Sequence, residues 1–136
     1  MGSPSSGSPW QKQMRLRRPE EFRRVRSEGR SWAHPLFVLW RAPGTMDGSR
    51  VGIAASRRVG NAVERNRARR LLREAVRKLY GRIIGGWDIV LVARSGLLGV
   101  GEAQVAVALR SVMERANLLT PIDAGTSAEP DAWGTV

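Results

Sequence analysis

The stretch from Ala62 to Tyr80 constrains the fold of this chain most, because its apolar residues recur with the 3.6-residue period of an α-helix. The repeat places them on a single stripe: Ala68, Leu71, Leu72, Ala75, Val76 and Leu79. Asn61 suits the N-cap of such a helix, and Gly81 suits its end. At about 100° per residue, a sector beside the stripe carries a polar row: Asn66, Arg69, Arg70, Arg73 and Arg77. The stretch therefore predicts an amphipathic helix with one apolar face and one basic face.

Weaker local patterns predict a mixed α+β domain around this helix. Pro19, followed by two Glu, is typical of a helix start, and Gly29 is typical of a helix end. The apolar run over 87–94 favours burial on both faces and so predicts a central strand. Also expected are strands over 36–40 and 50–56, joined as an antiparallel hairpin through 43–49, and a last helix over about 102–119. The predicted architecture is a small two-layer α/β sandwich in the order α-β-β-(β)-α-β-α, where the parentheses mark one further short strand.

Charge is distributed unevenly along the chain. Residues 11–30 carry eight cations and three acids, net +5, and residues 50–82 carry eleven cations and two acids, net +9. The last 17 residues carry three acids and no cation, and the first ten are rich in Gly, Ser and Pro, as in the remnant of an expression tag. We therefore expect one folded domain over 15–119, between a disordered tail over 1–14 and a flexible acidic tail over 120–136.

The residue inventory excludes several classes of function. The chain has no Cys and a single His, His34, which rules out disulfides, cysteine-based catalysis and zinc sites built from several thiolates or imidazoles. No apolar run approaches the roughly 20 residues that a membrane-spanning helix needs, and we expect a cytoplasmic protein. We predict no catalytic residue and no metal site in the chain itself.

The net charge of +11 indicates a polyanionic partner. Arg supplies nearly all of the cations, and its planar fork suits phosphate groups. A solvated helix face is the alternative explanation for the basic block over 56–74, but such faces interleave acids, and here only Glu64 and Glu74 intervene. Four aromatic residues flank the basic segments, where core packing competes with stacking on single-stranded RNA: Phe22, Trp32, Phe37 and Trp40.

The same region carries a resemblance to a known family. The resemblance lies mainly in one basic tract, made of four segments: Arg50-Val51-Gly52-Ile53, Ser56-Arg57-Arg58-Val59-Gly60-Asn61-Ala62-Val63, Arg65-Asn66-Arg67 and Arg69-Arg70-Leu71-Leu72-Arg73-Glu74. Upstream it is joined by Glu21-Phe22, Val25, Gly29 and Phe37-Val38-Leu39-Trp40, and downstream by residues 88–94. This pattern resembles the protein component of bacterial ribonuclease P, over about 15–119, and it leaves both tails unmatched.

The resemblance implies a left-handed β-α-β crossover and an accessory subunit of an endoribonuclease whose RNA subunit performs the catalysis. In this family the RNA removes the 5′ leader of precursor tRNA with Mg²⁺, which is bound mainly by the RNA. The implied partners are the ribonuclease P RNA and precursor tRNA, with no membrane and no obligate protein partner. The implied RNA-subunit contacts are Arg65, Asn66, Arg67, Arg69, Arg70 and Arg73. The implied leader-binding cleft lies between the first helix and the sheet, at Phe22, Phe37, Trp40, Ser56, Arg57 and Arg58.

One departure from the family pattern concerns the cleft. The family often has a second aromatic residue one helical turn after Phe22, where this chain has Arg26, so Arg stacking or charge would replace it. The residues alone also leave other functions open: a general RNA-binding module, a nuclease with its own metal site, or a DNA-binding module. Asp47 and Asp88 form no recognisable metal cluster in the sequence, and the basic helix lacks the short preceding helix of a helix-turn-helix.

Overall fold

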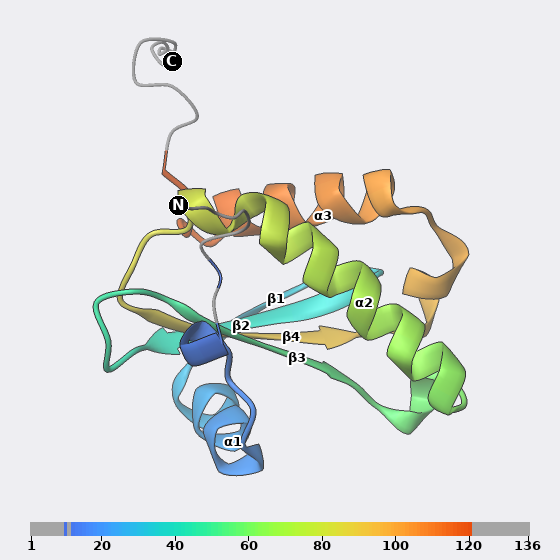
Figure 1. Ribbon diagram of the computed structural model, residues 1–136, viewed down its shortest axis with the longest axis horizontal. Coiled ribbons are helices and arrows are strands. Elements are labelled where there is room, and N and C mark those ends of the chain that lie inside the picture. Colours follow the sequence, from blue (N-terminus) through green and yellow to red (C-terminus); the bar gives the residue numbers. More distant parts are fainter. Residues whose placement is uncertain (1–9, 11, 121–136) are drawn as a thin grey trace, which may run out of the picture.

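The computed structural model describes Trp10 and residues 12–120, which form a mixed domain of helices and one sheet (Figure 1). Its helices are α1 (Pro19–Glu28), α2 (Ala62–Leu79) and α3 (Glu102–Arg115). Its strands are β1 (Arg30–Ala33), β2 (Phe37–Pro43), β3 (Arg50–Ala55) and β4 (Trp87–Ala93). Short 3-10 turns lie at Lys12–Met14, Arg57–Val59, Tyr80–Arg82 and Ser95–Gly99. The α+β class is confirmed, and the one further strand, β1, precedes the two predicted strands instead of following them.

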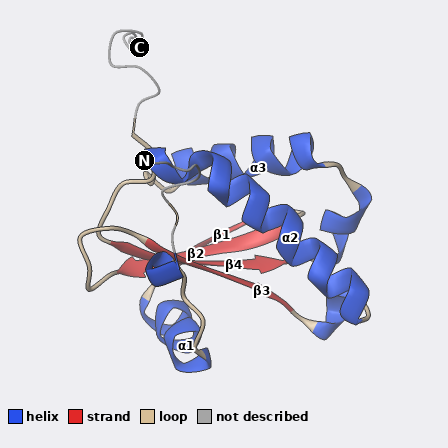
Figure 2. Cartoon of the chain, in the orientation of Figure 1, coloured by secondary structure: helices blue, strands red, loops and turns tan. Residues whose placement is uncertain are grey.

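The four strands form one sheet in the order β1-β2-β4-β3 (Figure 2). β4 pairs antiparallel with β2 and parallel with β3, so the predicted central position of residues 87–94 is confirmed. The predicted hairpin between 36–40 and 50–56 is wrong, because β4 lies between those two strands. The connecting loop pairs instead with the residues just before β4: Gly44 N–H donates to Gly86 O over 2.8 Å, and Ser49 Oγ donates to Ile84 O over 2.6 Å.

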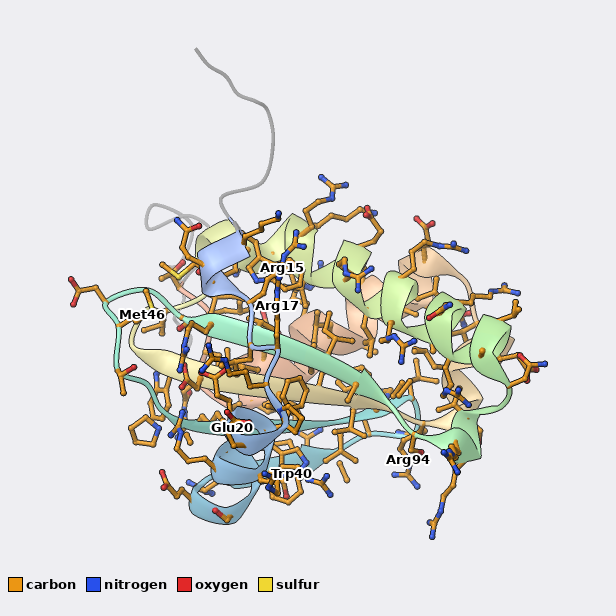
Figure 3. All side chains as sticks on the ribbon, turned by 60° about the horizontal axis from the view of Figure 1, so that its bottom comes forward. Arg15, Arg17, Glu20, Trp40, Met46 and Arg94 are labelled. Atoms are coloured by element: carbon orange, nitrogen blue, oxygen red, sulfur yellow. The ribbon has the colours of Figure 1, made fainter. Side chains whose placement is uncertain are left out.

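The parallel pair β3 and β4 is joined through α2, which makes a β-α-β crossover. In Figure 1, α2 lies above the sheet and β3 lies in front of β4, and Figure 3, turned by 60°, shows the same arrangement. The path along β3, back through α2 and into β4 therefore winds in the left-handed sense, against the strong general preference for right-handed crossovers. This agrees with the fold that the resemblance implies.

The main core lies between α2, α3 and one face of the sheet. Its largest fully buried side chains come from every one of these elements: Phe37, Leu39, Leu72, Ile89, Leu91, Leu109 and Met113. Five of the six residues in the predicted stripe of α2 are buried here, and Leu79 is half-buried. The apolar stripe therefore performs the role that its period predicted, which is to hold α2 against the sheet.

Among the described helices, α1 alone covers the opposite face of the sheet, over a smaller cluster made by Leu16, Val25, Ala42 and Val90. Buried charge adds to this contact. Asp88, on β4, is 1% exposed and accepts hydrogen bonds from Arg50 Nε to Oδ1 over 3.0 Å and from Arg50 Nη2 to Oδ2 over 2.8 Å. Arg24 of α1 also pairs with Asp88, and Arg50 Nη1 bonds Glu21 over 2.8 Å. The hydrogen bonds that Arg50 donates to the Asp88 carboxylate raise the pKa of its guanidinium. These charges fix α1 to the sheet.

The folded unit begins earlier than the predicted residue 15. Trp10 is 4% exposed and belongs to the main core, and residues 12–14 form a 3-10 turn. The Trp10 ring stacks on Tyr80 with ring centroids 6.4 Å apart, and its Nε1 donates to Met14 O over 3.0 Å. Sequence alone gives no sign of this, because Trp10 stands outside any apolar period. Of the predicted tails over 1–14 and 120–136, residues 1–9, 11 and 121–136 lie outside the described residues.

Candidate nucleic-acid interface

A capping box fixes the start of α2, the basic helix. Asn61 Oδ1 accepts from Glu64 N–H over 2.9 Å, and Glu64 Oε1 accepts from Asn61 N–H over 2.9 Å. The predicted N-cap at Asn61 is therefore confirmed. The helix ends at Leu79, two residues before the predicted stop, and a 3-10 turn over Tyr80–Arg82 follows it.

The residues that the resemblance assigns to the RNA subunit all lie on α2. Four of them are exposed: Asn66, Arg67, Arg70 and Arg73. Arg65 and Arg69 are half-buried at the flank, where Arg65 Nη1 donates to Gly60 O over 2.8 Å and Arg69 contacts Asn66 Oδ1. Both contacts use neutral oxygens. In the part of the chain that the structure describes, none of these arginines pairs with a carboxylate.

Uncompensated charge on one helix face destabilises the folded state by mutual repulsion. An RNA backbone relieves that repulsion and releases its own condensed counterions on binding. The exposed face of α2 can therefore bind a phosphate backbone, with the guanidinium forks as donors.

A second surface lies on the α1 side of the sheet. The rings of Phe22 and Trp40 are half-buried and pack with Val92 against the small cluster under α1. Phe22 approaches β3 closely at Gly52, where an added Cβ would lie 2.6 Å from Phe22 Cζ. Figure 3 shows Trp40 beside α1 on this face. The part of the sheet next to α1 is thus an apolar floor with two partly exposed rings.

Arg26 takes part in this second surface. Its guanidinium carbon lies 5.7 Å from the centroid of the Trp40 ring. The position that is often aromatic in the family therefore holds an Arg that stacks on the neighbouring strand's aromatic residue. The stack holds the planar, positively charged guanidinium of Arg26 over the apolar surface next to α1, where it could contact a base or a phosphate.

A basic turn borders the same surface at the carboxyl end of β3. Ser56 caps the 3-10 turn over Arg57–Val59 by accepting from Arg58 N–H over 3.3 Å. Ser56, Arg57 and Arg58 are all exposed. The turn lies between the surface on the α1 side of the sheet and the start of α2, whose exposed face is basic.

Arg94, which sequence reasoning missed, is exposed at the carboxyl end of β4. The alternation from Asp88 through Val90 and Val92 could have placed it on the α1 side.

Phe37 does not join this surface, and its prediction as a cleft residue is wrong. Its side chain is 0% exposed and lies in the main core on the α2 and α3 side of the sheet. Because successive residues of a strand point to opposite faces, Phe37 and Trp40 on β2 cannot share a face. The ring of His34 stacks on Phe37 instead, with centroids 5.2 Å apart.

The described residues offer neither a metal site nor a membrane-spanning helix. No group of three or more His, Asp or Glu there could hold a metal ion. Asp88, the one buried carboxylate among them, is already paired with Arg24 and Arg50. No helix of the described part is long and apolar enough to cross a membrane. What the described residues do offer is a basic helix face and a partly aromatic sheet face.

The family model described as Ribonuclease P matches residues 10–117, which includes Trp10 and all the elements above. The ribonuclease P protein component of Herpetosiphon aurantiacus is 43% identical over 108 residues, covering 79% of this chain and 88% of that protein. The one from Roseiflexus sp. strain RS-1 is 44% identical over 114 residues, covering 83% and 93%.

Solved structures show the same likeness in three dimensions. The RNase P protein of Staphylococcus aureus superposes with a TM-score of 0.72 at 29% identity, covering 79% of this chain and 98% of that chain. The RNase P protein of Thermotoga maritima gives 0.68 at 34% identity, covering 74% and 96%. With sequence and fold both matched over nearly the whole described domain, the chain belongs to the ribonuclease P protein family, the protein components of an RNA-binding, tRNA-processing endoribonuclease.

Proposed function

We propose that this chain binds the catalytic RNA subunit of ribonuclease P through α2 and holds the 5′ leader of precursor tRNA against the α1 side of its sheet. The observation that carries the proposal is that the α2 arginines between Arg65 and Arg73 have no carboxylate partner in the described residues. The RNA-contacting side chains are Arg65, Asn66, Arg67, Arg69, Arg70 and Arg73. The leader-contacting side chains are Phe22, Trp40, Ser56, Arg57 and Arg58, together with Arg26.

Positioning and charge are the chain's contribution to the reaction. Holding the leader beside the RNA subunit makes the encounter with the scissile bond effectively intramolecular. The basic surface reduces repulsion between two polyanions, so their association requires less Mg²⁺. Mg²⁺ supplies the metal-ion catalysis, and we assign its binding to the RNA subunit because the described residues offer no carboxylate cluster that fits it. A cytoplasmic location belongs to the same proposal.

The direct test is cleavage of a precursor tRNA with a 5′ leader at low Mg²⁺ concentration. Three reactions are compared: the full chain alone, a bacterial ribonuclease P RNA alone, and the two together. Cleavage at the mature 5′ end only in the mixture supports the proposal. Cleavage by the chain alone would place an active site in this protein. If the mixture cleaves no better than the RNA alone, the chain would be a general RNA-binding module.

The cleft assignment has its own test in the assembled complex. Phe22→Ala should weaken the affinity for precursor tRNA with a leader, while the affinity for mature tRNA stays unchanged. Loss of base stacking is worth about 1–3 kcal/mol per base, so a drop of roughly tenfold is expected. Val107→Ala, an exposed apolar truncation on α3, serves as the matched control. Equal leader dependence in both variants would overturn the cleft assignment.

A further inference from the structure

A pocket of about 330 Å³ opens at the outer edge of β3, between α1 and α2. Arg15 and Arg17 line it from the segment that leads into α1, and Arg73 lines it from α2. Two aromatic rings, Trp10 and Phe22, form part of its walls. Figure 3 shows Arg15 and Arg17 on this segment, beside β3. We call it the edge pocket. Only Phe22 and Arg73 belong to the surfaces already assigned.

The floor of the edge pocket is the open edge of a strand. β3 is the last strand of the sheet, and the preceding segment pairs with it only at Val51, through the Arg15–Val51 bridge and the 3.1 Å bond from Leu16 N–H to Val51 O. Ile53, two residues further, lines the pocket. An edge strand presents backbone N–H groups that an oxygen ligand can use. The pocket therefore offers backbone donors beside the guanidinium groups.

Arg15 is held in place, yet its donors are not used up. Its guanidinium carbon lies 4.8 Å from the centroid of the Trp10 ring, and Trp10 is itself fixed by its stack on Tyr80. Arg15 Nε is buried and has no hydrogen-bond partner among the described residues. A buried donor without an acceptor destabilises the folded state, because it has lost its hydrogen bonds to water. An anionic oxygen in the pocket would remove that cost.

The positive charge of the edge pocket also favours an anionic ligand. In the part of the chain that the structure describes, Arg15, Arg17 and Arg73 form no ion pair, so three cations face one small cavity without an internal counterion. Guanidinium groups prefer phosphate and carboxylate oxygens. The volume is at the lower end of ligand pockets, which suits one phosphate with its sugar rather than a whole oligonucleotide.

We propose that the edge pocket binds one phosphodiester of RNA, with Arg15 and Arg17 as its principal ligands. The inference rests on the proposed function and extends it, because Phe22 belongs to the leader-binding surface and Arg73 to the RNA-subunit surface. A strand bound here would pass from one surface to the other around the edge of β3. The phosphate belongs either to the leader or to the RNA subunit, and separate binding measurements distinguish the two sources.

The test compares the full chain with Arg15→Gln/Arg17→Gln and with a matched control, Arg110→Gln/Arg115→Gln, which removes the same charge from exposed positions of α3. One measurement is the affinity for a bacterial ribonuclease P RNA across a range of salt concentrations. The other is the affinity of the assembled complex for precursor tRNAs with a long leader and with no leader. Arg17→Gln alone, at an exposed position, keeps the test valid if the double variant does not fold.

Losing one phosphate contact should make the slope of log affinity against log salt shallower by about 0.7 for a single strand or 0.9 for a helix. At roughly 0.1 M salt this slope corresponds to a five- to eightfold loss of affinity. A loss confined to the long-leader substrate assigns the phosphate to the leader, and a loss in assembly assigns it to the RNA subunit. Equal behaviour of the pocket variants and the α3 control would overturn the inference. Failure of the unmodified chain to support cleavage would instead overturn the proposed function.

Discussion

Arginine serves two different purposes in two regions of this molecule. Between α1 and the sheet, Arg24 and Arg50 surround the buried carboxylate of Asp88, and Arg50 also reaches Glu21. On α2, the exposed Arg67 and Arg70 have no carboxylate partner in the described residues. The side chains are chemically identical, so the difference lies in their partners. Arginines whose charge is neutralised inside the fold stabilise the fold, and those left without a counterion remain available for RNA.

The largest effect is expected from breaking the paired region. Asp88→Asn removes the buried charge but keeps the shape, and it leaves Arg24 and Arg50 with only their partly exposed partners, Glu28 and Glu21. Breaking a buried ion pair by removing one partner typically costs about 3–5 kcal/mol, and we expect a loss of that size in the free energy of unfolding. Urea denaturation followed by circular dichroism measures it. Asp47→Asn, in an exposed loop, is the control and should stay within about 0.5 kcal/mol. A similar small effect for Asp88→Asn would show that the network does not hold α1.

The second effect concerns the unpaired region and should appear in binding, not in stability. Arg67→Gln/Arg70→Gln removes two exposed charges from α2. Each lost phosphate contact should lower the affinity for the RNA subunit by roughly eightfold at about 0.1 M salt. The free energy of unfolding should stay the same or rise slightly, because repulsion on the helix decreases. Filter binding and urea denaturation of the same preparation measure the two quantities. A clear loss of stability with unchanged binding would contradict the comparison.

A smaller effect is expected from simple anions. Inorganic phosphate should bind the unpaired arginines of the native state and raise the thermal midpoint, by roughly 5 °C if about 1 kcal/mol of binding free energy is gained. Chloride at matched ionic strength is the reference solution. The rise should shrink in Arg67→Gln/Arg70→Gln, and an equal rise in both proteins would assign the anion effect to another part of the surface.

The smallest effect is expected at Tyr80, which stacks on the Trp10 ring that Arg15 contacts. Burial raises the pKa of the Tyr80 phenol above its ordinary value. The unfolded chain therefore ionises first, and this contribution to stability, complete below about pH 10, is lost as the pH rises through the folded pKa. Tyr80 is the sole tyrosine of the chain, so ultraviolet absorbance reports its titration directly. Trp10→Ala should bring the native titration closer to that of the urea-unfolded chain. An unchanged titration would show that the Trp10 ring does not bury the phenol.

The helices and the basic face were predictable because their signals are local. The cap at Asn61, the apolar period of α2 and the terminal Gly29 of α1 each lie within a few residues of the element that they define. The central position of β4 followed from its apolar character on both faces. The wrong hairpin between β2 and β3 shows the limit of such reasoning, since strand order depends on pairing between distant segments, and β4 joins the sheet from over 30 residues further along.

The candidate site was predictable in its residue types but not in which face each residue occupies. Phe37 and Trp40 lie three residues apart on β2, and strand alternation separates them, but only the packing of α2 and α3 on one face of the sheet shows which of the two is buried. Trp10 stands alone among polar neighbours, so nothing local marks it as a core residue. The pairing of Arg24 and Arg50 with Asp88 spans 64 and 38 residues of sequence, and no local pattern distinguishes these arginines from the unpaired ones.

One measurement tests the division between paired and unpaired arginines most directly. Arg50→Gln and Arg70→Gln remove the same charge, and for each variant the free energy of unfolding and the affinity for the RNA subunit are determined under one set of conditions. We predict that Arg50→Gln lowers the free energy of unfolding while the folded protein keeps its RNA affinity, and that Arg70→Gln does the reverse. Equal losses of stability and of affinity in both variants would contradict the account, because the partners of an arginine would then not decide its role.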